Sequence, residues 1–269
     1  AFLLFMGGKW NIPAATWIGS IFFLRYFRRQ QSGWGILLAV PFILGASHIF
    51  FMGLAVQVDL QFLILIDVCF ALYIMVPCLI DRALHHRIKN PLLSTLVYPA
   101  ALITVQFLLS YIEQLGTVLH WTGSMFSMKP LLQLVAVTGV WGPSFLVGWL
   151  ASVANTLWEA RLDLKKAKWP VMIFTGVFVL VSLAGGIRMV FFSPQPGTVK
   201  VGSVVAGLPE DNQSYHYIDD MSPAEQARHK EAYRQWTRDV QDDLFAASEG
   251  LISSGIEILS WPSGNAAVF

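Results

Sequence analysis

The stretch that decides the fold is residues 169–206, WPVMIFTGVFVLVSLAGGIRMVFFSPQPGTVKVGSVVA, where an apolar run gives way to a polar segment. Residues 169–192 contain one charged residue, Arg188, and exceed the roughly 20 apolar residues that a helix needs to cross a bilayer. Pro194 and Pro196 follow, and residues 198–206 are then rich in β-branched side chains. This order predicts the last helix of a membrane domain, its exit from the bilayer, and the first strand of an attached domain.

The composition of the whole chain supports a membrane part and a polar part. The 269 residues are 55% hydrophobic and only 13% charged, whereas ordinary globular domains carry roughly 25% charged residues. Residues 1–192 hold 13 basic and six acidic residues (net +7), while residues 193–269 hold five basic and 11 acidic residues (net −6). These values exclude a disordered chain, a basic nucleic-acid-binding domain and a typical soluble enzyme. The only two cysteines, Cys69 and Cys78, are too few for a zinc site, and no cofactor is expected.

Further apolar runs upstream predict six membrane-spanning helices in all, because a helix satisfies every backbone polar group within the bilayer. The expected spans are residues 1–24, 32–56, 60–80, 92–112, 131–158 and 169–192. The chain opens with Ala1 inside an apolar run, so we expect a cut or processed start with the first span completed by earlier residues.

The loops between these spans differ in charge and predict the orientation of the chain. Alternate loops carry ten basic residues, and the opposite loops carry only Lys9 and Lys129. The ten are Arg25, Arg28, Arg29, Arg82, Arg87, Lys89, Arg161, Lys165, Lys166 and Lys168. Basic loops stay in the cytoplasm, so residues 193–269 should be exoplasmic, which is periplasmic if the membrane is a bacterial inner membrane.

The polar segment predicts a strand, a helix and a second strand. Residues 198–206 form the first strand, and Ser222 and Glu225 make a capping box at the start of a helix that ends near Gly255. Residues 256–261 form the second strand. A strand–helix–strand connection predicts parallel pairing, and a parallel sheet needs more than two strands. We therefore expect the start of a larger α/β domain, completed by sequence beyond this chain or by a second chain.

The same order of segments resembles the apolipoprotein N-acyltransferases, the membrane branch of the nitrilase (carbon–nitrogen hydrolase) superfamily. Residues 132–158, LQLVAVTGVWGPSFLVGWLASVANTLW, look like the membrane signature of that family. Residues 11–29 resemble its early apolar-then-arginine segment. Residues 199–205 and 255–262 resemble its first strand and the strand that delivers a catalytic glutamate. The resemblance implies a helical membrane bundle followed by an α-β-β-α sandwich, of which this chain holds the first β-α-β unit.

The family's chemistry, as the resemblance implies it, is acyl transfer by a Glu, a Lys and a Cys. The Cys thiolate takes an acyl chain from a phospholipid as a thioester, and the N-terminal amine of a diacylglyceryl-cysteine lipoprotein then receives it. Relatives carry Glu directly after the dipeptide that contains Trp261, whereas this chain has Ser263 there, and it lacks the Lys and the Cys. A serine hydroxyl is no general base near neutral pH, so the chain as given should be inactive. Trp261 and Arg188 are candidate substrate contacts.

Two other hypotheses stay open beside the enzyme. The chain can be a catalytically silent protein that binds lipid or lipoprotein, or one half of a split enzyme. An unrelated transporter is less favoured, because the spans contain few charged residues and no inverted repeat is visible. The intramembrane carboxylate Asp67 is either functional or hydrogen-bonded to a neighbouring helix, and His48 is more simply a hydrogen-bonded residue of the bundle.

Overall fold

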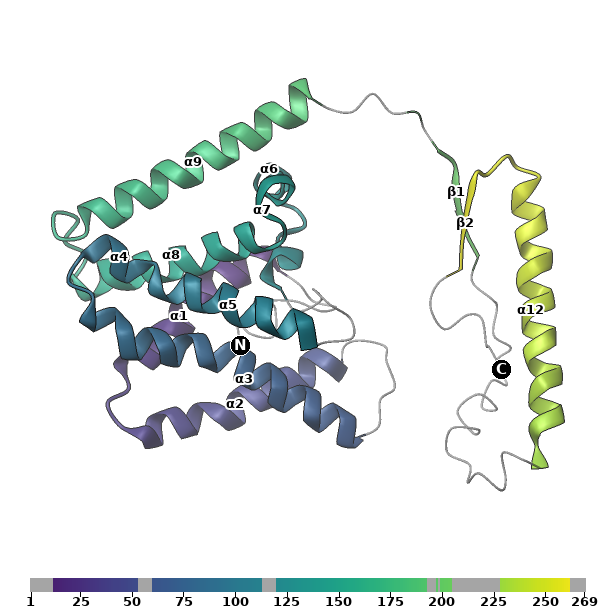
Figure 1. The fold of residues 1–269 in the computed structure, drawn as a ribbon, viewed down its shortest axis with the longest axis horizontal. Helices are drawn as coiled ribbons and strands as arrows, with labels where there is room; N and C mark the ends of the chain where they lie inside the picture. Colours follow the sequence, from purple (N-terminus) through teal and green to yellow (C-terminus); the bar gives the residue numbers. More distant parts are fainter. Residues whose placement is uncertain are drawn as a thin grey trace. The chain divides into compact units, whose positions relative to one another are not determined.

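A computed structural model describes residues 12–52, 60–112, 120–192, 197, 199–204 and 228–261 (Figure 1). The chain divides into two compact units, Ala1–Ser193 and Pro194–Phe269. In their described parts, the first unit is helical and the second holds two short strands and one long helix.

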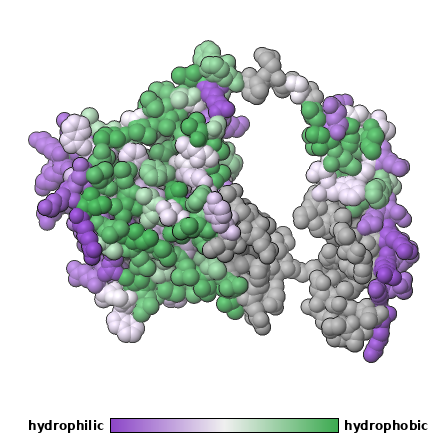
Figure 2. Space-filling model, viewed as in Figure 1, coloured by the Kyte–Doolittle hydropathy of each residue, from purple (hydrophilic) through white to green (hydrophobic). Residues whose placement is uncertain are grey.

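The first unit is a bundle of apolar helices. Its helices are α1 (Pro13–Arg29), α2 (Gly33–Met52), α3 (Leu60–Leu84), η3 (His85–Arg87), α4 (Pro91–Thr95), α5 (Val97–Ile112), η4 (Trp121–Met125), α6 (Lys129–Leu132), α7 (Val135–Thr138), α8 (Trp141–Glu159) and α9 (Lys168–Phe191). Helix α3 packs against α2 and α5, and α8 packs against α1, α5 and α9. Leu24, Leu102 and Val147 are fully buried in the core between them. Figure 2 shows a hydrophobic outer face on this unit, with hydrophilic residues gathered at one end.

Three of the described helical segments are long and apolar enough to cross a membrane. They are Asp67–Arg87, Pro91–Tyr111 and Lys168–Phe191. Each corresponds to a span that the sequence predicts, and much of their surface is exposed on the outside of the bundle, as a lipid-facing helix requires. By length and composition, the first unit is therefore built as part of a membrane protein.

The prediction of one continuous helix over residues 131–158 is wrong. The segments Lys129–Thr138 and Trp141–Glu159 meet at an angle of 117°, and count as a fourth span only if the bent pair is taken together. Gly139 lies at the break with φ +64°, a left-handed conformation that glycine adopts without a Cβ penalty. Pro143 lies in the first turn of α8, where its missing N–H leaves no helical hydrogen bond unmade. Hydropathy alone could not locate this break, because the residues on both sides are apolar.

The other two predicted spans are not seen at full length in the described residues. Of residues 1–24, the first 11 lie outside the described part of the chain, and α1 begins at Pro13. Residues 53–56 of the expected span 32–56 also lie outside it, and the apolar stretch Gly33–Ile49 of α2 is shorter than a full crossing needs. Within the described residues, three of the six expected spans are thus present as helices long and apolar enough to cross a membrane, or four with the bent pair.

The second unit contains a parallel strand–helix–strand arrangement. Strands β1 (Val201–Ser203) and β2 (Ile258–Ser260) pair in parallel, with Val201 opposite Ile258, and α12 (Lys230–Ile252) connects them. Gly255, with φ +80°, turns the chain from the helix toward β2. The capping box at residues 222–225 lies outside the described residues. Two strands do not establish a nitrilase-like sandwich, and that assignment stays a prediction.

The small core of this unit lies between α12 and the strands. Leu244 and Val204 are buried, and Leu251, Leu259 and Trp261 pack against them. A Cβ on Gly202 would come within 2.9 Å of Ile256 Cδ1, so β1 lies close to the residues that follow α12. The buried serine of the helix, Ser248, faces this core and satisfies its hydroxyl by donating to the carbonyl of Leu244 at 2.6 Å.

Candidate functional site

The three site residues that the sequence predicts do not form a site in the described part of the chain. Ser263 lies outside the described residues. Trp261 packs in the small core, where its Nε1 donates to Ser248 Oγ at 3.1 Å and its ring meets Phe245 edge-on at 5.1 Å. Arg188 is exposed on α9, and no side-chain partner is found for it among the described residues. Trp261 and Arg188 belong to different units, so each is assigned only its own local role.

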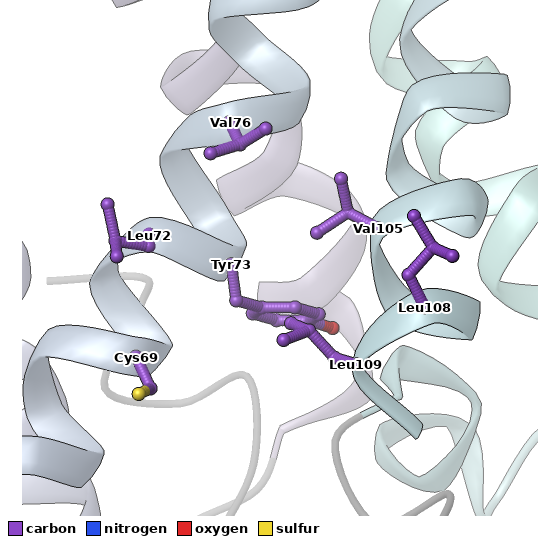
Figure 3. A pocket seen from close by; sticks show the side chains of 7 residues that line it. All are labelled: Cys69, Leu72, Tyr73, Val76, Val105, Leu108 and Leu109. Atoms are coloured by element: carbon purple, nitrogen blue, oxygen red, sulfur yellow. The ribbon is translucent and has the colours of Figure 1, made fainter. Parts of the chain in front are cut away.

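One apolar cavity in the described part of the membrane unit lies between α3 and α5 (Figure 3). Its volume is about 270 Å³, and it is lined by Cys69, Leu72, Tyr73, Val76, Val105, Leu108 and Leu109. The ring of Tyr73 points into it, and the hydroxyl of Tyr73 accepts a hydrogen bond from Gln106 Nε2 at 2.6 Å. Because the lining is almost entirely hydrocarbon, the cavity suits an acyl chain and not a polar group.

A second apolar cavity of about 330 Å³ lies where α5, α7, α8 and α9 meet. It is lined by Ile103, Leu134, Thr138, Trp141, Gly142, Phe145, Leu146, Trp149, Val177 and Val181. The break at Gly139 turns α7 away from the axis of α8, so that residues on both sides of the break border the same space. The indole of Trp149 is held by its Nε1, which donates to Thr95 Oγ1 at 3.1 Å. This fixed aromatic wall and the aliphatic residues of α9 make a second space suited to hydrocarbon.

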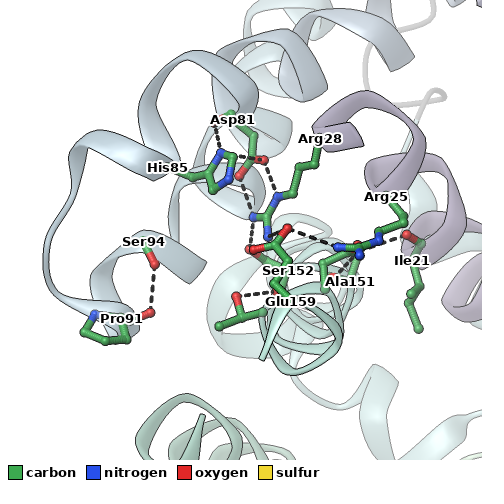
Figure 4. A network of polar contacts seen from close by, with 12 residues as sticks. Ile21, Arg25, Arg28, Asp81, His85, Pro91, Ser94, Ala151, Ser152 and Glu159 are labelled. Carbon is green, nitrogen blue, oxygen red and sulfur yellow. Dashed lines mark hydrogen bonds and ion pairs between the residues drawn. The ribbon is translucent and has the colours of Figure 1, made fainter. Parts of the chain in front are cut away.

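A buried polar network ties α1, α3 and α8 together at one end of the bundle (Figure 4). Arg28 of α1 donates from Nε to Asp81 Oδ2 at 2.7 Å and from Nη2 to Asp81 Oδ1 at 3.0 Å, a bidentate pair. The same Nη2 donates to Ser152 Oγ of α8 at 2.9 Å. The side chain of Arg28 is 2% exposed and that of Asp81 is fully buried. The ion pair with Asp81 and the hydrogen bond to Ser152 therefore hold α1, α3 and α8 in fixed positions relative to one another.

Arg25 extends this network toward the surface, and the buried His85 joins it at Asp81. Arg25 Nη1 lies 3.2 Å from Glu159 Oε1, and the Arg25 guanidinium stacks 5.2 Å from the centroid of the Trp158 ring. His85 Nδ1 donates to the carbonyl of Asp81 at 2.7 Å and lies 3.6 Å from its carboxylate. The arrangement suits helix assembly, because every carboxylate in it is already paired with a cation.

The intramembrane carboxylate Asp67 is hydrogen-bonded to a neighbouring helix, which is the simpler of the two readings of the sequence. Ser47 Oγ of α2 donates to Asp67 Oδ1 at 2.8 Å, and His48 Nδ1 lies 2.9 Å from Asp67 Oδ2. Hydrogen bonds of this kind reduce the cost of a buried carboxyl group and hold α2 against α3. His48 is likewise a hydrogen-bonded residue of the bundle.

None of these features is a catalytic centre of the expected kind. The lining of the cavity that contains Cys69 offers no carboxylate or imidazole to activate its thiol. The described residues contain no group of three or more His, Cys, Asp or Glu side chains that could hold a metal ion. The membrane unit therefore provides spaces for hydrocarbon and a rigid frame, and the described residues of the second unit provide no nucleophile with a base.

Sequence reasoning missed the buried network and both cavities. The charge pattern of the loops treats Arg28 only as a loop cation, yet Arg28 is the penultimate residue of α1 and lies one turn after the fully buried Leu24, on the inner face of the helix. Asp81 is the sequence signal that could have indicated a buried ion pair. It is an acidic residue at the end of an apolar run, and the residues that follow it are otherwise basic. The cavities have no sequence signal, because their lining residues are mostly ordinary apolar residues of five helices, α3, α5, α7, α8 and α9.

Comparison of the chain with protein-family models, with curated proteins and with solved structures gives no match.

Proposed function

We propose that this chain is the membrane-embedded part and the first β-α-β unit of an apolipoprotein N-acyltransferase-like protein. The substrates would be a phospholipid acyl donor and a lipoprotein acceptor, at the outer face of a bacterial inner membrane. The observation that carries the proposal is the parallel strand–helix–strand unit that follows the last apolar helix, α9. This is the order in which the resembling family joins its membrane bundle to its nitrilase-like domain.

The apolar cavities add a physical reason for a lipid substrate. Each is lined by hydrocarbon and lies among helices whose outer surfaces are apolar. A phospholipid that diffuses in the bilayer plane can place an acyl chain in such a space without passing through water, so the transfer from lipid to protein costs little desolvation. This supports a membrane protein that handles two lipid-bearing substrates.

Ser263 favours a second candidate, a catalytically silent lipid- or lipoprotein-binding protein. It stands where the resembling family has its glutamate, and a hydroxyl cannot take the proton that a carboxylate takes. Another chain that supplies the missing strands and the Lys and Cys would make the complex a split enzyme. The two candidates share the lipid-binding role of the membrane unit and differ in acyl transfer.

Acyl transfer by the full-length protein in phospholipid vesicles separates these candidates. The measurements are a hydroxylamine-sensitive acyl-thioester on the protein and the acylation of a synthetic diacylglyceryl-cysteine peptide. We expect a weak signal or none with Ser263 and a clear signal with Ser263→Glu, since restoring a base typically contributes 10²–10⁴-fold, as an order of magnitude.

The matched control is Ser254→Glu, which adds the same side chain at an exposed position just after α12. It should leave the signal at the level of the unaltered protein. Silence of both variants, with the peptide and phospholipid still bound, would establish the silent lipid-binding candidate. Loss of binding to both lipids would contradict the proposal altogether.

A further inference from the structure

We propose that the hydrophilic end of the membrane unit is a binding surface for the headgroups of anionic phospholipids. This surface, here named the basic rim, consists of Arg29, Arg87, Lys89, Arg161, Lys165 and Lys168. It goes beyond the proposed function, since it concerns the bilayer that surrounds the protein and not the acyl donor or acceptor. Figure 2 shows this end as the hydrophilic part of a unit that is otherwise hydrophobic.

The tertiary structure brings the basic rim together from three separate parts of the chain. Arg29 ends α1, Arg87 ends η3, and Arg161 to Lys168 form the connection between α8 and α9. The buried network joins these parts, because Arg28 pairs with Asp81 just before η3 and Arg25 pairs with Glu159 at the end of α8. Cations far apart in sequence thus share one end of the bundle.

The six side chains of the basic rim carry charge that the protein does not neutralise. All six are exposed, and none of them has an ion-pair partner within the described ranges. The acidic residues nearby are already engaged, Asp81 by Arg28, Glu159 by Arg25, and Asp163 by Lys166 at 3.9 Å. The rim therefore has a net positive field with no internal counter-charge, which favours an anionic ligand.

Exposed apolar side chains between the cations identify the ligand as a lipid. In the α8–α9 connection Leu162 is 69% exposed and Leu164 is 60% exposed, and Trp169 is 65% exposed at the start of α9. Lys168 Nζ lies 5.8 Å from the centroid of the Trp169 ring. Leucines and an indole beside lysines match the boundary between acyl chains and headgroups, where apolar side chains enter the hydrocarbon and amines reach phosphates. A nucleic acid or an acidic protein would leave these leucines in water.

The backbone of the α8–α9 connection is strained where it carries these residues. Arg161 and Leu162 have φ values of 56° and 62°, left-handed conformations that are unfavourable for residues with a Cβ. A hydrogen bond from Leu162 N to the carbonyl of Leu157 at 2.9 Å holds the turn. Neither residue is glycine, although glycine would remove the strain. The exposed side chains of Arg161 and Leu162 are thus presented together at this turn.

The test compares binding of two lipids to the full chain purified in detergent. Native mass spectrometry measures the apparent Kd for dioleoyl phosphatidylglycerol and for dioleoyl phosphatidylcholine, which differ in headgroup charge. We expect the anionic lipid to bind more tightly by at least about tenfold, and its advantage to vanish near 1 M salt, where the Debye length is about 3 Å.

The triple variant Arg161→Gln, Lys165→Gln and Lys168→Gln should weaken phosphatidylglycerol binding by roughly fivefold per cation, on the order of 100-fold in all. Phosphatidylcholine binding should not change. The charge-retaining variant Arg161→Lys, Lys165→Arg and Lys168→Arg should keep the preference.

The matched control neutralises three exposed cations of the second unit, Lys200, Lys230 and Arg238, to Gln. It should leave both lipid affinities as they are. Equal affinity for the two lipids in the unaltered chain would overturn the proposal. So would an equal loss in the rim variant and the control, or a preference that is undiminished in the rim variant.

Discussion

Replacing the buried carboxylate Asp81 by asparagine is the sharpest test of how the membrane unit is held together. Asp81→Asn keeps the size and one carbonyl oxygen of the side chain but removes the charge that faces Arg28. The Arg28 guanidinium, at 2% exposure, would then lose its bidentate counter-charge and keep only the long ion pair to Glu159, whose Oε1 lies 3.9 Å from Arg28 Nη1. Its remaining hydrogen bonds would be to neutral acceptors, Ser152 Oγ at 2.9 Å and the amide oxygen of the new asparagine.

The expected loss follows from the burial of this pair. Removing one partner of a buried ion pair typically costs about 3–5 kcal/mol, since the other charge stays desolvated. We expect Asp81→Asn to lower the free energy of unfolding by that amount. The assay is unfolding of the chain in mixed micelles by added sodium dodecyl sulfate, followed by far-UV circular dichroism.

The matched control is Asp163→Asn, which removes the same charge from an exposed ion pair. Asp163 lies 3.9 Å from Lys166, and the two side chains are 42% and 74% exposed. Exposed pairs contribute about 0–1 kcal/mol, so this variant should unfold almost as the unaltered chain does. The double variant Arg28→Met with Asp81→Leu should recover at least half of the loss, because no unpaired charge remains. Equal effects of Asp81→Asn and Asp163→Asn would refute the assignment of Arg28 and Asp81 as the central tie of the bundle.

Three further predictions follow from local geometry. In Gly185→Ala, the added Cβ would collide with the carbonyl oxygen of Pro130, so α9 must move away from α6 at a cost of about 1–3 kcal/mol in unfolding free energy. Burial lowers the pKa of His120, whose Nδ1 accepts a hydrogen bond from Gly123 N, so the folded state binds a proton less readily than the unfolded state does. The contribution of His120 to stability is therefore complete above its ordinary pKa of 6.5 and is lost as the pH falls from 6.5 toward the lowered pKa of the folded state. Unfolding curves measured across that pH range would show the loss. Leu244→Ala, at a fully buried position, should cost about 2–5 kcal/mol in the thermal or chemical unfolding of the second unit.

Each of these predictions has a control at a comparable position. A Cβ on Gly176, also within α9, meets nothing within 4 Å, so Gly176→Ala should be neutral or stabilising by about 1 kcal/mol. His120→Asn removes the titrating ring, and the pH dependence below 6.5 should shrink with it; an unchanged pH profile would contradict its origin in His120. Ile252→Ala, at a side chain that is 58% exposed, should cost far less than Leu244→Ala, and equal costs would argue against the small core described here.

The sequence predicts the parts of the fold that depend on local composition. Hydropathy is a sum over neighbouring residues, so it located the apolar segments that became α3, α4 with α5, and α9. The strand–helix–strand order also followed from local signals, and the parallel pairing followed from the long connection between the strands. Gly255 was expected to end the helix, and it adopts φ +80° just after α12.

The break at Gly139 and the choice of buried side chains in α12 could not be predicted from local composition. The residues before and after Gly139 are all apolar, so the run reads as one span although the helix axis turns by 117°. In α12 the apolar Ala247, three residues after the buried Leu244, is exposed, whereas the polar Ser248 is buried at 4% exposure. A serine is accepted there because its hydroxyl bonds both Leu244 O and Trp261 Nε1.

The sequence by itself determined that this chain is apolar enough for a bilayer, which ends of its helices are basic, and where its polar unit begins, because each of these is a property of consecutive residues. Only the tertiary structure decided that Arg28 meets Asp81, that Asp67 meets Ser47, and that the basic loops form one surface. Such pairings join residues from different helices, and they depend on how the helices pack, which no local sum of hydropathy or charge contains.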